Sequence, residues 1–296
     1  MTNPPRGPIH AAYQRLLPEP TRVRFKIWRH RAKGRIRRAN HTMFDPILRD
    51  TEERLASLAG QYAGERCFIM GNGPSLNQMD LDRFDGEHVW ASNRAFLLFD
   101  RITWRPDFWV AVDRRVVPDN AAELVALQDE LPDTKFFYPD HFRTSRVLRS
   151  RPNTYWFREG PFDESDIPWG VFSRDVTRHV SPVRTVTITA IQLAIHLGFD
   201  PIYLIGCDTT YSVPETVRVE DGNAEFLLST HDDDHNHFDS RYFGAGKRWH
   251  EPHPDRMLRH YAHVAVAARE LGVTIVNATV GGALEAFTRQ DYRELV

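Results

Sequence analysis

CFIMGNGPSL, residues 67–76, is the stretch of the chain that decides the fold. Its first four residues are apolar and favour a short buried strand, and the two glycines that follow allow a sharp turn and the close approach of a ligand. Pro74 suits the first position of a helix, where its missing N–H costs nothing. A strand, a glycine-rich turn and a helix N-terminus together offer backbone N–H groups to an anion, although a tight turn without a ligand gives the same pattern.

From residue 66 onward, short apolar stretches alternate with helical patterns. Strands are predicted at 66–70, 88–92, 108–112, 135–138, 154–157, 202–206 and 274–277, and helices at 74–81, 120–131, 187–197 and 255–271. This alternation predicts an α/β fold, a Rossmann-like and mostly parallel sheet with helices on both faces. Residues 212–254 are polar, rich in His and Asp, and show no clear element, which is typical of a functional loop.

The first 40 residues are strongly basic. Residues 1–40 contain eleven basic residues and one acidic residue, although the whole chain has a net charge of −2. Helical spacing at 21–39 and 44–62 predicts a basic helical arm over residues 1–60, followed by a nucleotide-binding catalytic domain over residues 61–296. Such an arm suits an anionic membrane surface or the acidic body of the protein itself. The rest of the chain is acidic, so we expect no nucleic-acid partner.

Composition narrows the protein class. No apolar run approaches the roughly 18 residues of a membrane span, and the N-terminus has no apolar signal region. Cys67 and Cys207 are the only cysteines, and both lie at predicted strands. We therefore expect a cytoplasmic protein without disulfides. Residues 1–40 are the part of the chain that would associate with a membrane. The oligomeric state is not predicted.

Polar residues follow the ends of several predicted strands. In a doubly wound sheet, ligands bind beyond the carboxyl ends of the strands, although a polar residue there is often only a turn former. A second anion-binding turn is predicted before the helix at 187–197. The predicted nucleotide-binding residues are Gly71, Asn72, Gly73, Ser75, Asn93, Asp113, Thr187, Gly206 and Asp208.

The histidine-rich segment HDDDHNH, residues 231–237, allows two interpretations. Its side chains are of the types that bind divalent ions, and Asp232, Asp234 and His235 are the metal candidates. However, the spacing matches no closed zinc site, so a polar loop over the substrate is the favoured interpretation. His250 and His237 are candidates for a general base that accepts a proton from an acceptor hydroxyl, with a surface role as the alternative for each.

These residues resemble a known group of proteins. GNGPSL (71–76), SNR (92–94) and IYLIGCD (202–208) are similar to the bacterial sialyltransferases that use CMP-activated sugars. They are also similar to the related group that contains motility accessory factors and archaeal 6-hydroxymethylpterin diphosphokinases. The C-terminal part of the chain resembles the diphosphokinase-like domain more closely, at NHF (236–238), YFG (242–244), His250 and NATVGGALE (277–285). The resemblance covers roughly residues 64–290 and leaves the basic arm unmatched.

The sialyltransferase resemblance implies roles for individual residues. Asn72, Ser75 and Asn93 would contact the cytidine nucleotide. A histidine of the late loop would act as the base, with His250 as the first positional match and His237 as the second. The remaining residues implied for the nucleotide-sugar pocket are Thr187, Gly206, Asp208 and Tyr211.

Three functions follow as hypotheses. The leading one is a glycosyltransferase that uses a nucleotide-activated sugar, such as a CMP-linked nonulosonate, and a glycan or glycolipid acceptor. His250 or His237 would be the base, and Tyr211 would stabilise the departing nucleotide. The second is a Mg²⁺-dependent diphosphokinase that transfers pyrophosphate from ATP to a pterin alcohol, with Asp113 and Asp208 among its metal ligands. The third is a non-catalytic nucleotide-binding subunit. No tightly bound cofactor is expected.

Overall fold

The computed structural model describes residues 46–160, 171–220 and 222–296. The chain divides into two units after Asp50, and the second unit, Thr51–Val296, contains the sheets and the site. Residues 1–45 of the predicted basic arm lie outside the described residues, so the arm and its boundary at residue 60 stay predictions. Within the described ranges, no helix is both long enough and apolar enough to cross a membrane.

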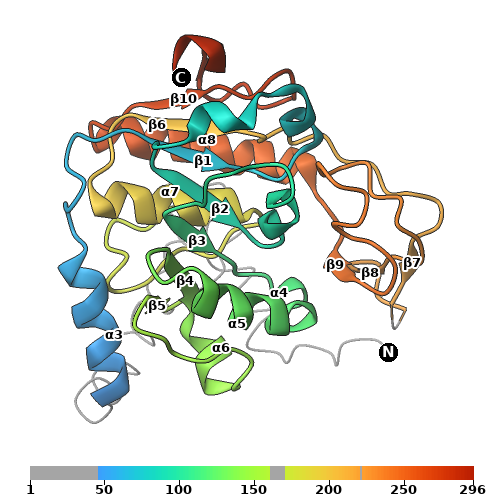
Figure 1. Ribbon diagram of the computed structural model, residues 1–296, viewed down its shortest axis with the longest axis horizontal. Helices are drawn as coiled ribbons and strands as arrows, with labels where there is room; N and C mark the ends of the chain where they lie inside the picture. Colours follow the sequence, from blue (N-terminus) through green and yellow to red (C-terminus); the bar gives the residue numbers. More distant parts are fainter. Residues whose placement is uncertain (1–45, 161–170, 221) are drawn as a thin grey trace, which may run out of the picture. The chain divides into compact units, whose positions relative to one another are not determined.

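Eight parallel strands form the main sheet, in the order β11-β10-β6-β1-β2-β3-β4-β5 (Figure 1). This confirms the predicted α/β, Rossmann-like class. The predicted strands are all present, with ends that differ from the prediction by at most two residues. They are β1 (Cys67–Met70), β2 (Val89–Ser92), β3 (Phe108–Val110), β4 (Lys135–Pro139), β5 (Thr154–Phe157), β6 (Ile202–Ile205) and β10 (Ile275–Asn277), and the unpredicted β11 (Thr288–Arg289) extends the edge.

The order of the strands reverses at β1. Strands β2 to β5 are added on one side of β1, and the chain then crosses back to place β6 on its other side. Both neighbours pair with β1 in parallel, with Phe68 opposite Val89 in β2 and opposite Tyr203 in β6. The connections that leave β1 and β6 therefore run to opposite sides. Such a switch point opens a crevice at the carboxyl ends of the two strands.

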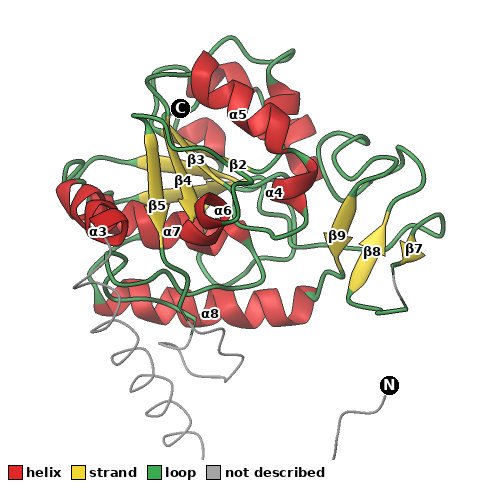
Figure 2. Cartoon of the chain, turned by 90° about the horizontal axis from the view of Figure 1, so that it is seen from below, coloured by secondary structure: helices red, strands yellow, loops and turns green. Residues whose placement is uncertain are grey.

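Both faces of the sheet are covered. Helix α7 (Val186–Leu197) and helix α8 (Pro254–Glu270) pack on one face, and α5 (Ala121–Glu130) packs on the other (Figure 2). Successive side chains of a strand point to opposite faces, so Cys67 and Ile69 belong to one buried cluster and Phe68 and Met70 to the other. This two-sided burial explains why the strands read as continuous apolar runs. The remaining helices are α3 (Pro46–Ser57), α4 (Val116–Asp119) and α6 (Asp140–Thr144).

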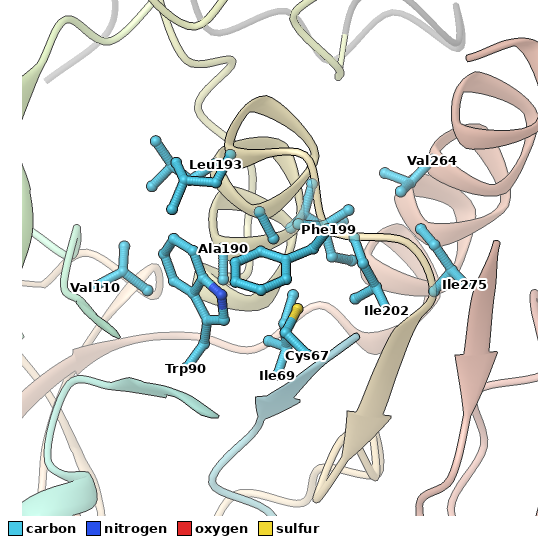
Figure 3. Packing of buried hydrophobic residues seen from close by; sticks show 14 of the residues in the cluster. Cys67, Ile69, Trp90, Val110, Ala190, Leu193, Phe199, Ile202, Val264 and Ile275 are labelled. Atoms are coloured by element: carbon cyan, nitrogen blue, oxygen red, sulfur yellow. The ribbon is translucent and has the colours of Figure 1, made fainter. Parts of the chain in front are cut away.

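The ends of α7 follow the predicted local chemistry. The side chain of Thr185 caps the N-terminus by accepting a hydrogen bond from the N–H of Thr187. Gly198 ends the helix with a φ of 99°, a left-handed conformation that glycine adopts without strain. Figure 3 shows that Trp90 and Phe199 lie between the strands and α7, in the middle of the larger core cluster. Helix α7 is thus capped at both ends and packed against the sheet along one side.

Two predictions about secondary structure are wrong. The predicted helix at 74–81 is a pair of 3₁₀ turns, Pro74–Gln78 and Leu81–Phe84, because the extended backbone of Met79 and Asp80 breaks the run between them. Residues 212–254, in which no element was expected, contain an antiparallel sheet of β7 (Arg218–Val219), β8 (Phe226–Leu228) and β9 (Arg248–His250). These strands of two or three residues are too short to give a recognisable alternation. In Figure 2 this small sheet stands beside the main sheet, next to α4.

The core at Trp90 gives a stability prediction. The Trp90 side chain is fully buried and stacks on Phe108, with ring centroids 4.5 Å apart. We expect Trp90→Ala to lower the free energy of unfolding by about 3–5 kcal/mol, because it leaves a large cavity. Denaturant unfolding measures this change. Val219→Ala, at an exposed position, is the control and should change stability by less than about 0.5 kcal/mol. A Trp90→Ala protein as stable as this control would contradict the prediction.

Candidate functional site

The turns after β1 and β6 touch at the carboxyl edge of the sheet. The N–H of Gly71 donates to the carbonyl of Ile205 at 2.8 Å, and the N–H of Gly73 donates to the carbonyl of Gly206 at 2.9 Å. A Cβ atom on Gly71 would lie 2.3 Å from the Gly206 oxygen, so no larger residue fits there without a shift of the backbone. The glycines are therefore needed for the contact between the two turns.

Asp208 closes this junction from the β6 side. Its carboxylate accepts hydrogen bonds from the backbone N–H of Ser75 at 3.1 Å and from the Ser75 hydroxyl at 2.7 Å. A Cβ atom on Gly73 would lie 1.8 Å from Oδ2 of Asp208, so the carboxylate occupies the space beside that glycine. Burial raises the pKa of Asp208, and the hydrogen bonds from Ser75 partly offset this rise. The predicted residues Gly71, Gly73, Ser75, Gly206 and Asp208 are thus brought together.

Asn72 and Asn93 contribute amide groups from β1 and β2. The side-chain amide of Asn72 donates to the hydroxyl of Ser92 at 2.9 Å. The carbonyl oxygens of both asparagine side chains are buried and have no hydrogen-bond partner among the described residues. Asn93 has a φ of 51°, which is uncommon outside glycine. Buried acceptors normally have a partner, so these two oxygens are suited to accept hydrogen bonds from a ligand.

His237 reaches the same turn from the segment between β6 and α8, residues 212–253, which contains the small sheet and is called the insertion below. Its Nδ1 lies 2.7 Å from Oδ2 of Asp234, and its ring stacks on Tyr242 with centroids 3.9 Å apart. The N–H of Phe238 donates to the carbonyl of Asn72 at 3.0 Å, which ties this segment to the glycine-rich turn. Burial acts to raise the pKa of Asp234, but the hydrogen bonds from His237, Asn236 and Phe243 outweigh it and lower the pKa. Asp234 is therefore an ionised partner that orients the imidazole.

Tyr211 lies beside His237. The two rings meet edge to face, with centroids 6.0 Å apart. Burial raises the pKa of the Tyr211 hydroxyl, and the nearby carboxylate of Asp234 raises it further. The hydroxyl thus stays protonated at neutral pH and can act as a hydrogen-bond donor.

His250 and Asp113 form a second pair of the same kind. His250 lies on β9, and its Nδ1 is 2.9 Å from Oδ2 of Asp113, just beyond β3. The other oxygen of Asp113 accepts hydrogen bonds from the N–H groups of Arg115 and Val116. Burial acts to raise the pKa of Asp113, but His250 and these N–H groups lower it. Two strand spacings separate β3 from β1, so this pair lies about 10 Å along the sheet edge from the turn after β1.

The N-terminus of α7 lies near the β6 turn. Burial raises the pKa of Cys207 to about 12, and a hydrogen bond from the Thr187 side chain partly offsets this rise. Thr187 is in the first turn of α7, so the positive end of the helix dipole lies close to Gly206 and Cys207.

The metal candidates have separate partners. Asp232 accepts a hydrogen bond from the N–H of Ala245, His235 lies 2.5 Å from the hydroxyl of Ser212, and Asp234 binds His237. No group of three or more potential metal ligands is found in the part of the chain that the structure describes.

Several residues that complete the site were assigned no role from the sequence. Ser92 holds Asn72, Phe238 ties the insertion to the β1 turn, and Tyr242 supports His237. Asp234 was considered only as a metal candidate, although its spacing of three residues from His237 suits a hydrogen-bonded pair. An open hollow lies beyond β10 and next to the β6 turn, because Thr279 in its lining accepts a hydrogen bond from the N–H of Cys207 at 3.0 Å. Its lining also includes Gln78, Arg289 and Tyr292, and it contains none of the predicted residues.

Comparisons with known proteins point to one family. The chain matches the family described as "6-hydroxymethylpterin diphosphokinase MptE-like" over residues 44–214. Among solved structures it is similar to the MAf glycosyltransferase from Magnetospirillum magneticum AMB-1, at 17% sequence identity and a TM-score of 0.46. The match covers 84% of this chain and 39% of that chain, so this chain spans less than half of the glycosyltransferase. No curated protein matches the sequence.

The lowered pKa of Asp234 predicts how pH affects stability. A carboxylate with a depressed pKa in the folded state stabilises the fold above its unfolded pKa of about 4, and this contribution is lost as the pH falls toward the folded pKa. At pH 7 we expect Asp234→Asn to lower the free energy of unfolding by about 1–3 kcal/mol. Below about pH 4 the difference from the wild type should shrink. Denaturant unfolding at pH 7 and pH 3 tests this, and an equal difference at both values would contradict it.

Proposed function

We propose, from the premise that the chain belongs to the 6-hydroxymethylpterin diphosphokinase MptE-like family, that it is a transferase. It takes a group from a nucleotide donor and transfers it to an acceptor hydroxyl at the carboxyl edge of the main sheet. The leading form of the proposal is a glycosyltransferase whose donor is a nucleotide-activated sugar, with a CMP-linked nonulosonate as the candidate donor. The acceptor would be a glycan or glycolipid. A membrane contact through residues 1–40 stays a prediction, because those residues lie outside the described ranges.

One observation supports the proposal most strongly. The His237–Asp234 pair is bound to the glycine-rich turn through the hydrogen bond between Phe238 and Asn72. The Nε2 atom of His237 has no hydrogen-bond partner among the described residues, and an imidazole held by a carboxylate in this way suits a general base. A base fixed at the carboxyl edge is what transfer to a hydroxyl needs. The N–H groups of Gly71, Gly73 and Ser75 are bonded within the protein, so the donors for a phosphate would come from the start of α7 instead of the glycine-rich turn.

The proposed step uses residues of this chain alone. The acceptor hydroxyl gives its proton to His237, and its oxygen forms a bond to the anomeric carbon of the sugar. The bond between that carbon and the phosphate oxygen breaks, and the electron pair leaves with the nucleotide. Tyr211 and the backbone N–H groups at the start of α7 would stabilise the charge on the departing phosphate.

The carboxylates of the crevice favour a donor with few phosphates. Asp208 and Asp234 both lie close to the β1 turn, because Asp208 accepts hydrogen bonds from Ser75 and Asp234 binds His237. A triphosphate in the same space would meet more repulsion than the single phosphate of a CMP-sugar. This consideration places the glycosyltransferase ahead of the diphosphokinase.

A diphosphokinase remains the second candidate, and the family match favours it. The matched residues 44–214 include the glycine-rich turn, Asn93, Asp113 and Asp208, but neither of the two histidines. In this reaction an acceptor alcohol would take pyrophosphate from ATP, and AMP would leave. Asp208, beside the glycine-rich turn, is the carboxylate that would bind the metal ion that such chemistry uses, whereas Asp113 follows β3 and lies too far along the edge to share that ion.

Nucleotide binding separates the two candidates. A ligand that binds only the folded protein raises its stability by about 2.7 kcal/mol at a hundred times its dissociation constant. We expect CMP to raise the melting temperature of the full chain without Mg²⁺, and ATP with Mg²⁺ to have little effect. Asn72→Ala should reduce the CMP response, because the buried amide oxygen is lost. Gln78→Ala, an exposed position on the neighbouring turn, is the matched control. A response to ATP and Mg²⁺ alone would favour the diphosphokinase.

Kinetics identify the base. Removal of a single general base costs about 10²–10⁴-fold in rate, so His237→Ala should lower kcat by that factor while CMP binding persists. His250→Ala should have a smaller effect, because His250 lies two strands from the β1 turn. The reverse order would make His250 the base. Unchanged turnover in both variants would remove histidine catalysis from the mechanism, and binding of CMP without turnover of any sugar donor would indicate a non-catalytic subunit.

A further inference from the structure

Arg94 connects the end of β2 to the segment that carries His237. It follows Asn93 directly and is only 8% exposed. Its Nη1 donates to the backbone carbonyls of Arg241 and Tyr242, which lie in the insertion. One nitrogen of the guanidinium therefore fixes two successive carbonyls of the insertion against the carboxyl edge of the main sheet.

The residues at these carbonyls contact His237 and its partner. The Tyr242 ring stacks on the imidazole, with an interplanar angle of 8° and centroids 3.9 Å apart. The N–H of Phe243 donates at 3.0 Å to Oδ2 of Asp234, the same oxygen that lies 2.7 Å from Nδ1 of His237. The Phe243 ring meets the imidazole edge to face, with centroids 4.9 Å apart. The backbone at 241–243 therefore sets the position of both members of the pair.

The pair also determines which nitrogen of the imidazole carries the proton. Asp234 is ionised at neutral pH, because burial acts to raise its pKa but the hydrogen bonds that it accepts outweigh burial and lower the pKa. An ionised carboxylate can only accept hydrogen bonds, so Nδ1 of His237 is the donor and carries the proton. In a neutral imidazole the other nitrogen then holds a lone pair. This tautomer depends on Oδ2 of Asp234 staying in line with Nδ1.

The stability of the fold does not account for a guanidinium at this position. The acceptors of Arg94 are two neutral carbonyls, and Asp239, a carboxylate whose charge acts on Arg94, is paired with Arg241 instead. The Nε of Arg94 is buried and has no hydrogen-bond partner among the described residues. A buried charge without a counter-charge and a buried donor without an acceptor both cost free energy, which an apolar side chain would avoid. What an apolar side chain could not supply is the pair of hydrogen bonds to the insertion.

We propose that Arg94 is a positioning residue for His237. By holding the two carbonyls, it keeps the Tyr242 ring on the imidazole and the Phe243 N–H on Asp234. Both contacts keep the carboxylate in line with Nδ1, so the proton stays on that nitrogen and Nε2 stays bare. Arg94 acts on the imidazole through this backbone segment.

The proposed reaction would use this tautomer. If the proposed function holds, on which this step alone rests, Nε2 of His237 accepts the proton of the acceptor hydroxyl, and a proton already on that nitrogen would block the transfer. A shift of a reacting group by roughly 1 Å can slow such a step by about 10²-fold. We therefore expect Arg94→Met to lower kcat by about that factor, while the rise in melting temperature with CMP persists.

NMR of the imidazole nitrogens measures the tautomer in the full chain without any substrate. The chain is isotopically labelled at its histidine nitrogens, and spectra are recorded at about pH 9, above the ordinary histidine pKa of about 6.5. His237→Gln identifies the two signals by their loss. In the wild type we expect Nδ1 of His237 to have the chemical shift of a protonated nitrogen and Nε2 that of a bare one. In Arg94→Met we expect the two shifts to move toward each other, because the proton is then distributed over both nitrogens.

Arg105→Met is the matched control. Arg105 also donates through Nη1 to two backbone carbonyls, those of Ile102 and Trp104, but these belong to its own turn before β3. This variant should leave the His237 signals as they are in the wild type. Arg94→Lys keeps a donor group and the charge, so its signals should lie closer to the wild type than those of Arg94→Met. If Arg94→Met does not fold, Arg94→Gln, which is shorter and uncharged, provides the same comparison.

Three outcomes would overturn the proposal. The first is a wild-type protein whose His237 has its proton on Nε2. The second is a folded Arg94→Met or Arg94→Gln protein with the same His237 signals as the wild type, and the third is an equal displacement of these signals in Arg105→Met. None of these results depends on a nucleotide. A protein that responds to no nucleotide but loses the Nδ1 tautomer in Arg94→Met retains the positioning role and lacks the proposed function.

Discussion

The contact between two backbone turns determines how the carboxyl edge is built. Gly71 and Gly73 approach Gly206 and Asp208 so closely that a single methyl group at either glycine would collide with an oxygen atom. This approach is available only where β1 and β6 lie side by side, and that pairing follows from the reversal of strand order at β1. The position of Asp208 and the burial of the glycine-rich turn both depend on it.

The elements that could be predicted from the sequence are those with a local cause. The strands are predictable because each is buried on both faces and reads as an apolar run, and the ends of α7 are predictable from Thr185 and Gly198. The gathering of Gly71, Ser75 and Asp208 follows from one general rule, that parallel strands end at a common edge. Their position directly after a strand was enough to predict that these residues lie close together.

The histidines illustrate what sequence alone does not supply. His237 is paired with Asp234 and supported by Tyr242, and His250 is paired with Asp113 from the far end of β3. Both arrangements depend on a segment that folds into strands of two or three residues, whose pairing is decided by tertiary contacts rather than by any periodic pattern. The 3₁₀ turns after Pro74 were mistaken for a helix for a similar reason, since the extended residues that separate them are fixed by their surroundings.

The order of the parts along the chain has a consequence for biosynthesis. β1, the centre of the sheet, is made first, whereas Asp208, both histidines and the segment that carries them come after β5. A nascent chain that has emerged from the ribosome only as far as β5 contains the glycine-rich turn but none of those partners. The candidate site is therefore assembled late in translation, and a prematurely terminated product that ends before β6 lacks Asp208 and both histidines.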